Sequence, residues 1–264
     1  MGILNVTPDS FYDGGRHADP EAALTHARRL LAEGADLIDI GGESSRPGAA
    51  PISADEECGR VIPVVAALRR QTEVPISIDT TKAAVAAEAL TVGADVVNDI
   101  SAGRFDPGML PLVAARGATI VLMHMQGTPA TMQAAPHYVD VVAEVEAFLR
   151  ERTEAARAAG IAADRIWLDP GIGFGKRRED NVALLANLGH LRGLGAPLLV
   201  GASRKRFLAA DADDGPDDRL AASIAVATLA AAAGAAIVRV HDVAATRRAV
   251  ALADALTRTT HDAG

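Results

Sequence analysis

The chain has 264 residues, 49% hydrophobic and 23% charged, so it can bury a large core and lacks the composition of a disordered protein. Its formal net charge of −8 argues against nucleic-acid binding, because proteins that bind a phosphate backbone usually present a basic face. Its single cysteine, Cys58, excludes an intramolecular disulfide and favours a reducing, cytoplasmic location. No apolar run reaches the ~18 residues of a membrane span, and no signal peptide is recognisable. We therefore expect a cytoplasmic protein that binds neither nucleic acid nor membrane.

Short apolar runs recur along the chain and predict eight buried strands. Several follow a helix end and a Gly-Ala pair, such as Gly34-Ala35 and Gly117-Ala118. Glycine after a helix accepts the left-handed conformation that ends it, and a short β-branched run without alternation suits a strand buried on both faces. In chain order we expect strands near 2–6, 36–41, 75–79, 95–99, 119–124, 165–169, 197–202 and 236–241. Helical patterns follow the strands, for example at 20–33, 53–70, 137–159 and 217–233.

Eight alternations of strand and helix in a chain of this length predict a single α/β domain, a (β/α)8 TIM barrel over residues 1–264. An open, doubly wound sheet is the alternative. No linker or shift in composition divides the chain, and the acidic stretch 211–218 is short enough to be a loop after a strand.

Polar side chains stand at or just past the carboxyl ends of nearly all these strands. One such residue alone is often only a helix cap or turn former. Many together indicate a pocket at the barrel mouth, where barrel enzymes place their active sites. The residues are Asn5, Asp39, Asp79, Asn98, Asp99, His124, Asp169, Ser203, Arg239 and His241. The long loops 5–15 and 41–48 are candidate lids over this pocket.

Two further segments suggest how a ligand is held. The glycine-rich stretch 171–176 is one residue short of a phosphate loop, and Arg177 stands where that loop needs Ser or Thr. We therefore reject nucleoside triphosphate binding and expect these glycines to let the backbone approach a flat group beside Asp169. Arg239 and His241 point the same way along the last strand and would suit a pyrophosphate. The alternative is an ion pair between Arg239 and an acid lining the barrel.

Eight segments together resemble the signatures of the dihydropteroate synthase family of pterin-binding TIM barrels. In order they are GILNVTPDSF (2–11), DIGGES (39–44), IDT (78–80), VNDI (97–100), MHMQG (123–127), DPG (169–171), GASRK (201–205) and RVHD (239–242). The resemblance runs from end to end of the chain. It implies a transferase of folate biosynthesis that joins 6-hydroxymethyl-7,8-dihydropterin pyrophosphate to p-aminobenzoate, giving 7,8-dihydropteroate and pyrophosphate.

The resemblance also implies which residues hold the substrates. The dihydropterin would contact Asp79, Asn98, Asp169 and Lys205. We favour Asp169 as the carboxylate that accepts a pair of N–H groups from the pterin edge. The p-aminobenzoate would lie near Ser45, Phe174, Ser203 and Lys205.

The leaving pyrophosphate would be bound by Arg46, Arg239 and His241. Asn5 would be the protein ligand of a Mg²⁺ ion that otherwise holds water and pyrophosphate. The residues expected to act in catalysis are thus Asn5, Arg46, Lys205, Arg239 and His241. No general base is required, because an aniline nitrogen is neutral at pH 7. Family membership further implies a homodimer, which we expect to form through late helices such as 217–233.

The chain departs from the family pattern in three ways. Ser45 stands where threonine is usual and Tyr12 where serine is usual, and residues normally precede the first strand, so we expect an open barrel floor or a native start further upstream. Two other functions stay open. One is a non-catalytic paralogue that binds pterin. The other is a methyltransferase passing a methyl group from a reduced folate to a corrinoid, which gives no reason for Arg239 beside His241.

Overall fold

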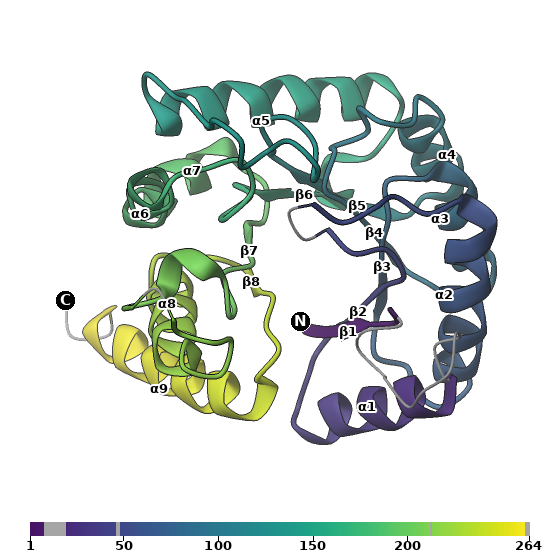
Figure 1. Ribbon diagram of the computed structural model, residues 1–264, viewed down its shortest axis with the longest axis horizontal. Coiled ribbons are helices and arrows are strands. Elements are labelled where there is room, and N and C mark those ends of the chain that lie inside the picture. Colours follow the sequence, from purple (N-terminus) through teal and green to yellow (C-terminus); the bar gives the residue numbers. More distant parts are fainter. Residues whose placement is uncertain (8–19, 46–47, 212, 262–264) are drawn as a thin grey trace.

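The computed structural model describes residues 1–7, 20–45, 48–211 and 213–261. Parallel strands form a ring, and helices surround it (Figure 1). The strands are β1 (Gly2–Asn5), β2 (Ile38–Gly41), β3 (Ile76–Asp79), β4 (Val96–Asp99), β5 (Thr119–Met123), β6 (Ile166–Asp169), β7 (Leu199–Val200) and β8 (Ile237–Val238). All eight predicted strands are confirmed, although β7 and β8 are shorter than expected.

The ring closes through backbone contacts at two places. β1 to β6 form one continuous parallel sheet in chain order, and β7 pairs with β8. Leu168 bridges Leu198, and Gly2 bridges Val240, so the pair joins the sheet on both sides. We call residues 197–202 and 236–241, which contain β7 and β8, the seam. The closed ring confirms the predicted barrel and excludes the open sheet.

Helices follow the strands on the outside of the ring. They are α1 (Pro20–Ala32), α2 (Ala54–Arg69), α3 (Ala83–Thr91), α4 (Met109–Arg116), α5 (Val141–Ala158), α6 (Arg178–Ala186), α7 (Leu188–Leu191), α8 (Leu220–Ala232) and α9 (Val243–His261). Short 3₁₀ turns lie at Ala163–Arg165, Arg192–Leu194 and Arg206–Leu208. Within the described ranges, no helix is long and apolar enough to cross a membrane.

Local caps explain where two helices begin. α5 starts at Val141, later than the expected 137, because the Asp140 carboxylate accepts hydrogen bonds from the N–H groups of Val142 and Ala143. α2 starts after Ser53, whose hydroxyl accepts from the N–H of Glu56. Cys58 lies in α2 as expected, and burial raises the pKa of its thiol to about 11.

The barrel interior has an apolar layer, and polar side chains stand two residues further along most of its strands. The apolar cluster contains Leu37, Val96 and Leu199, with Trp167 and Ile237 packed against it. Because side chains two residues apart in a strand share a face, the next inward position on each strand faces the same cavity. Those positions carry Asp39, Asn98, Gly201, Asp169 and Arg239. The larger core, which includes Leu4, Ile40 and Ile78, lies between the ring and its helices.

Candidate active site

Arg239 of the seam links the acids of two strands across the polar layer. Its Nε donates to Asp39 Oδ2 at 2.6 Å, and its Nη2 donates to Asp79 Oδ2 at 2.8 Å. Asn98 Nδ2 donates to the same Asp39 oxygen at 3.2 Å. The ion pair that lines the barrel, which was the alternative for Arg239, is therefore present. These bonds use Nε and Nη2, and no acceptor among the described residues is bonded to Nη1.

Burial dominates the electrostatics of these groups. Desolvation raises the pKa of Asp79 to about 7, against the opposing charge of Arg239 and with help from Asp39. Burial alone would lower the pKa of Arg239, but Asp39 and Asp79 hold it above its ordinary value. Arg239 therefore stays charged, whereas Asp79 changes its protonation state near neutral pH.

Asp39 is fully buried, and its second oxygen, Oδ1, has no hydrogen-bond partner among the described groups. An unpaired buried acceptor is costly. The polar layer is thus short of donors on this side, so a ligand or water with an N–H or O–H group would be stabilised there.

Asp169 and Lys205 form the second half of the polar layer. Asp169 Oδ1 accepts from the N–H of Gly171 at 2.7 Å, and burial raises the pKa of its carboxyl group. Burial lowers the pKa of Lys205 to about 7, and Asp169 opposes that shift. Lys205 donates to the carbonyl of Ile172, and its Nζ lies 4.3 Å from the centre of the Phe174 ring. The loops after β6 and β7 therefore meet over the barrel mouth.

Ser203 and His241 lie next to each other on the seam side of the mouth. Ser203 Oγ is 3.0 Å from His241 Nδ1, and it also accepts from the His241 backbone N–H at 3.2 Å. Ser203 is buried and His241 is partly exposed. The imidazole is thus held by its neighbour, with part of its surface open to solvent.

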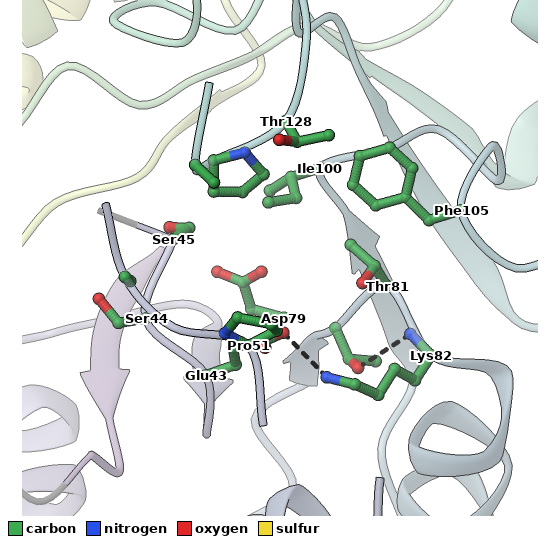
Figure 2. Close-up of a pocket in the computed structure, with 14 residues that line it drawn as sticks. Glu43, Ser44, Ser45, Pro51, Asp79, Thr81, Lys82, Ile100, Phe105 and Thr128 are labelled. Carbon is green, nitrogen blue, oxygen red and sulfur yellow. Dashed lines mark hydrogen bonds and ion pairs between the residues drawn. The ribbon is translucent and has the colours of Figure 1, made fainter. Parts of the chain in front are cut away.

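A cavity of about 240 Å³ lies between the loops after β2, β3, β4 and β5 (Figure 2). Asp79 points into it, and Ser45 and Ile100 line it. Phe174, Ser203 and Lys205, which the resemblance groups with Ser45, are not among the residues that line this cavity.

Three ionised groups that sequence reasoning missed support the same cavity. Lys82 Nζ donates to Glu43 Oε2 at 2.9 Å and to Glu57 Oε2 at 2.6 Å. Glu43 Oε1 accepts from the N–H of Ile52 at 2.9 Å, so the two ends of the segment after β2 are tied together. Glu57 is fully buried, and breaking a buried pair of this kind is strongly destabilising. Glu43 belongs to the DIGGES motif (39–44), but none of the motifs quoted above contains Glu57 or Lys82.

Two polar residues expected in the pocket have structural roles instead. Asp99 accepts from the N–H groups of Ser101 and Gly103, both at 2.7 Å, as a turn former. His124 is buried, its Nδ1 lies 2.9 Å from Lys176 Nζ, and burial lowers its pKa to about 2. The glycines after β6 also allow a close approach of backbone segments. The close approach they allow is to other parts of this chain, since a Cβ on Gly171 would lie 1.8 Å from the His124 carbonyl oxygen.

The remaining predicted residues are placed as follows. Asn5 ends β1 and is partly exposed at the mouth. Arg46 and Tyr12 lie outside the described residues. The structure thus brings Asp79, Asn98, Asp169, Lys205 and Arg239 into one polar layer, with Ser203 and His241 at its edge and Ser45 across the cavity.

Comparison with known proteins identifies the family. The pterin binding enzyme family matches residues 1–241. Dihydropteroate synthase of Escherichia coli K12 is 49% identical over 255 residues, which cover 97% of this chain and 90% of that protein. The chain belongs to the dihydropteroate synthase family.

Solved structures agree in fold as well as in sequence. A Yersinia pestis dihydropteroate synthase in complex with a sulfonamide drug superposes with a TM-score of 0.92 at 49% identity, covering 98% of this chain and 94% of that one. A Xanthomonas albilineans dihydropteroate synthase with 4-aminobenzoic acid gives a TM-score of 0.91 at 52% identity, covering 97% and 92%. Membership of this family confirms the function predicted from the sequence, which is the transferase reaction of dihydropteroate synthase in folate biosynthesis.

Proposed function

We propose that the polar layer binds the dihydropterin of the family reaction through Asp79, Asn98, Asp169 and Lys205. The observation that carries this assignment is the convergence of these groups above the apolar layer of the barrel. A flat ring resting on that layer would present its edge to the acids. An ionised Asp169 accepts two N–H groups from the amino-pyrimidinone edge, Asn98 both donates and accepts, and Lys205 donates to the carbonyl or a ring nitrogen.

The pyrophosphate would be held on the seam side. Arg239 offers its Nη1, and His241 stands two residues further along the chain, after β8. Charge-assisted hydrogen bonds from a guanidinium are short and strong. Arg46 would approach the same oxygens from the second loop. This assignment keeps Arg239 paired with Asp39 while it binds substrate.

The p-aminobenzoate would lie between the two sides of the mouth, near Ser45, Phe174, Ser203 and Lys205. The structure of the Xanthomonas albilineans relative contains 4-aminobenzoic acid, which supports this substrate class. The Phe174 ring offers an aromatic face, and the Lys205 ammonium above it offers a cation. Movement of the loop bearing Ser45 would then complete the site.

A magnesium ion would be held by Asn5 together with the substrate pyrophosphate and water. The side-chain carbonyl of asparagine is the hard oxygen donor that Mg²⁺ prefers, and this ion commonly keeps several waters. Within the described ranges, no three His, Cys, Asp or Glu side chains could hold a metal together. When bound, the ion supplies charge stabilisation to the departing pyrophosphate.

In the reaction, the amine nitrogen of p-aminobenzoate attacks the pterin methylene carbon. The carbon–oxygen bond breaks, and pyrophosphate leaves with the electron pair. The new secondary amine loses its proton to water or to the pyrophosphate. Arg239, His241 and Arg46 stabilise the negative charge that develops on the leaving oxygen, while Asp169 and Asn98 hold the methylene in line with the attacking nitrogen.

We also propose that the chain acts as a cytoplasmic homodimer. Leu229 of α8 is 68% exposed, and Leu252 and Leu256 of the neighbouring α9 are 61% and 63% exposed. Apolar side chains gathered on adjacent helices are typical of an interface between subunits. Analytical ultracentrifugation of the chain and of Leu229→Glu checks this: a dimer that dissociates in the variant supports the proposal, and a wild-type monomer contradicts it.

The decisive experiment follows pyrophosphate and 7,8-dihydropteroate together from the purified chain, dihydropterin pyrophosphate, p-aminobenzoate and Mg²⁺. We expect both products in equal amounts. Asp169→Asn should lower kcat/KM by about 100-fold or more, because two hydrogen bonds to a charged acceptor contribute roughly 3 kcal/mol in total. Asp164→Asn, an exposed change in a 3₁₀ turn, is the matched control and should leave kcat/KM unchanged.

Other outcomes identify the competing functions. A folded chain that binds dihydropterin but releases no pyrophosphate would be a non-catalytic paralogue. Methyl transfer from a methylated reduced folate to a corrinoid, without pyrophosphate release, would identify the methyltransferase. Full activity in Asp169→Asn would overturn the assignment of that carboxylate.

A further inference from the structure

Lys176 is a buried lysine that the proposed chemistry does not use. It ends the glycine-rich stretch that was rejected as a phosphate loop, and it is 3% exposed. Its Nζ lies 2.9 Å from His124 Nδ1, 2.9 Å from the Gly171 carbonyl oxygen and 3.0 Å from the Phe174 carbonyl oxygen. Burial lowers the pKa of its amine to about 7, and Asp169 opposes that shift. In its protonated form the amine has three N–H donors, and these three acceptors can use all of them. A fourth contact, to the His124 carbonyl oxygen at 3.4 Å, is longer.

The acceptors fix a segment that has little rigidity of its own. Gly171, Gly173 and Gly175 all have positive φ, at 68°, 83° and 60°. Glycine loses more conformational freedom on folding than any other residue, so ordering three of them within five residues is costly. Lys176 ties both ends of this segment to each other and to His124, which follows β5. Burial lowers the pKa of His124 to about 2, so its ring is neutral and Nδ1 can accept a hydrogen bond from Lys176.

The fixed segment touches the groups that the proposed function assigns to both substrates. The Gly171 N–H binds the Asp169 carboxylate at 2.7 Å, and the Ile172 carbonyl accepts from Lys205. The Phe174 ring lies under Lys205, 4.3 Å from its Nζ. A shift of the segment therefore moves the pterin carboxylate, the lysine and the aromatic ring together.

We propose that Lys176 is a positioning residue of the synthase reaction: it holds segment 171–175 in the shape that aligns Asp169, Phe174 and Lys205 for the two substrates. The proposal rests on the roles proposed above for those three residues. Lys176 itself acts from behind the segment and contacts backbone carbonyls and His124. Other side chains reinforce the same shape, since Tyr138 donates to the Gly175 carbonyl at 2.7 Å and Asn181 accepts from the Gly173 N–H at 2.6 Å.

The test uses steady-state kinetics with both substrates and Mg²⁺ on Lys176→Met and Lys176→Gln. We expect Lys176→Met to raise KM for p-aminobenzoate about tenfold and to lower kcat, because a misplacement of about 1 Å can cost up to about 100-fold in rate. Lys176→Gln keeps donors and should show about a third of that effect on KM. It also serves as the working variant if Lys176→Met does not fold.

A control separates positioning from general loss of stability. Leu149→Ala opens a cavity in the buried face of α5 and should lower the midpoint of urea unfolding with kcat and both KM values unchanged. Lys176 variants whose losses disappear under conditions where the protein is fully folded would overturn the proposal.

A double-mutant cycle with Phe174→Leu tests the route of the effect. If Lys176 acts by placing Phe174, the double variant should be little worse than Phe174→Leu alone for KM of p-aminobenzoate. Additive effects would overturn the proposal. Failure of the proposed function gives a different result: the wild type would form no product, or Phe174→Leu alone would leave KM unchanged.

Discussion

The six-stranded part of the barrel and the seam differ both in backbone pairing and in the side chains they supply. β1 to β6 are strands of four or five residues in one continuous sheet, whereas β7 and β8 have two residues each and join that sheet by single bridges. The sheet carries the acids and the amide of the polar layer, including Asp79, Asn98 and Asp169. The seam and its loops carry the cations Arg239 and Lys205. The acidic groups of the site thus come from the continuous sheet, and the basic groups come from the seam with its short strands.

The comparison shows that side-chain ion pairs connect the seam to its surroundings where few backbone hydrogen bonds do so. Arg239 of the seam is tied to Asp39 and Asp79 of the sheet, and Arg204 after β7 is tied to Asp242 by two bonds of 2.9 and 2.7 Å. These side chains also place the functional groups. Damage to one of them should therefore affect both substrate binding and the closure of the ring.

The largest expected effect comes from Arg239→Lys, which keeps the charge but loses the guanidinium fork. A lysine cannot bridge Asp39 and Asp79 and still reach a pyrophosphate. We expect kcat/KM to fall about 100-fold and the free energy of unfolding to fall by about 2 kcal/mol, because a buried carboxylate loses its partner. Kinetics and urea unfolding measure both quantities. Arg157→Lys, an exposed change on α5, is the control, and equal effects from the two variants would contradict the comparison.

Hydrogen exchange should separate the two parts directly. The seam amides of Ile237 and Arg239, bonded to Leu198 and Val200, are expected to exchange about 30-fold faster than the amides of β4 and β5. Segments with fewer cooperative contacts open locally at a lower free energy. Added pyrophosphate should slow the seam preferentially. Equal protection of the two parts would show that the short strands do not weaken the ring.

The smallest expected effect is in the pH dependence of kcat/KM. The sheet supplies a group that titrates on the acidic side of the profile, and the seam side supplies one that titrates on the alkaline side. Asp79 of the sheet has its pKa raised to about 7 by burial, so it gains a proton, and loses its charge, as the pH falls below 7. Lys205 beside the seam has its pKa lowered to about 7 and loses its charge as the pH rises. We expect kcat/KM to be highest near pH 7 and, well away from that maximum, to fall about tenfold for each pH unit on either side.

Two variants sharpen that profile. Asp79→Asn should weaken the acidic limb only, and the part that is left belongs to Asp169, whose pKa burial also raises. Lys205→Arg should weaken the alkaline limb only, and the part that is left belongs to Lys176, whose pKa burial also lowers to about 7. Rates of product formation from pH 5.5 to 9 give the profiles. A wild-type profile that is flat between pH 6 and 8 would show that neither group titrates in the free enzyme as its burial requires.

Much of this fold was predictable because each strand carries its own boundaries. The Gly-Ala pairs after helices and the unbroken apolar runs mark buried parallel strands, and all eight were predicted. The polar layer was predictable for the same reason, since Asp79, Asn98 and Asp169 stand at or next to the carboxyl ends of largely apolar strands. The lengths of β7 and β8 were not predictable, because the apolar runs that mark them continue beyond the two residues of each strand.

The supporting groups were not predictable, because their partners are distant in sequence. Lys176 meets His124 across 52 positions, and Lys82 meets Glu43 and Glu57 across 39 and 25 positions. A lysine gives no local signal of such partners. For the same reason His124 was grouped with the pocket, although its ring faces a buried lysine. The roles expected of Arg46 and Tyr12 stay predictions, since both lie outside the described residues.

The bond between Arg239 and Asp39 joins residues 200 positions apart. Contacts of such sequence separation form late, because the chain must first lose the entropy of a very large loop. A chain growing from the ribosome would complete the sheet from β1 to β6 well before β8 is available to it. During that interval Asp39 would lack its cation, and the half-finished ring would expose two strand edges. Catalytic competence would therefore appear only with the last step of folding, and measured activity would report the completed ring.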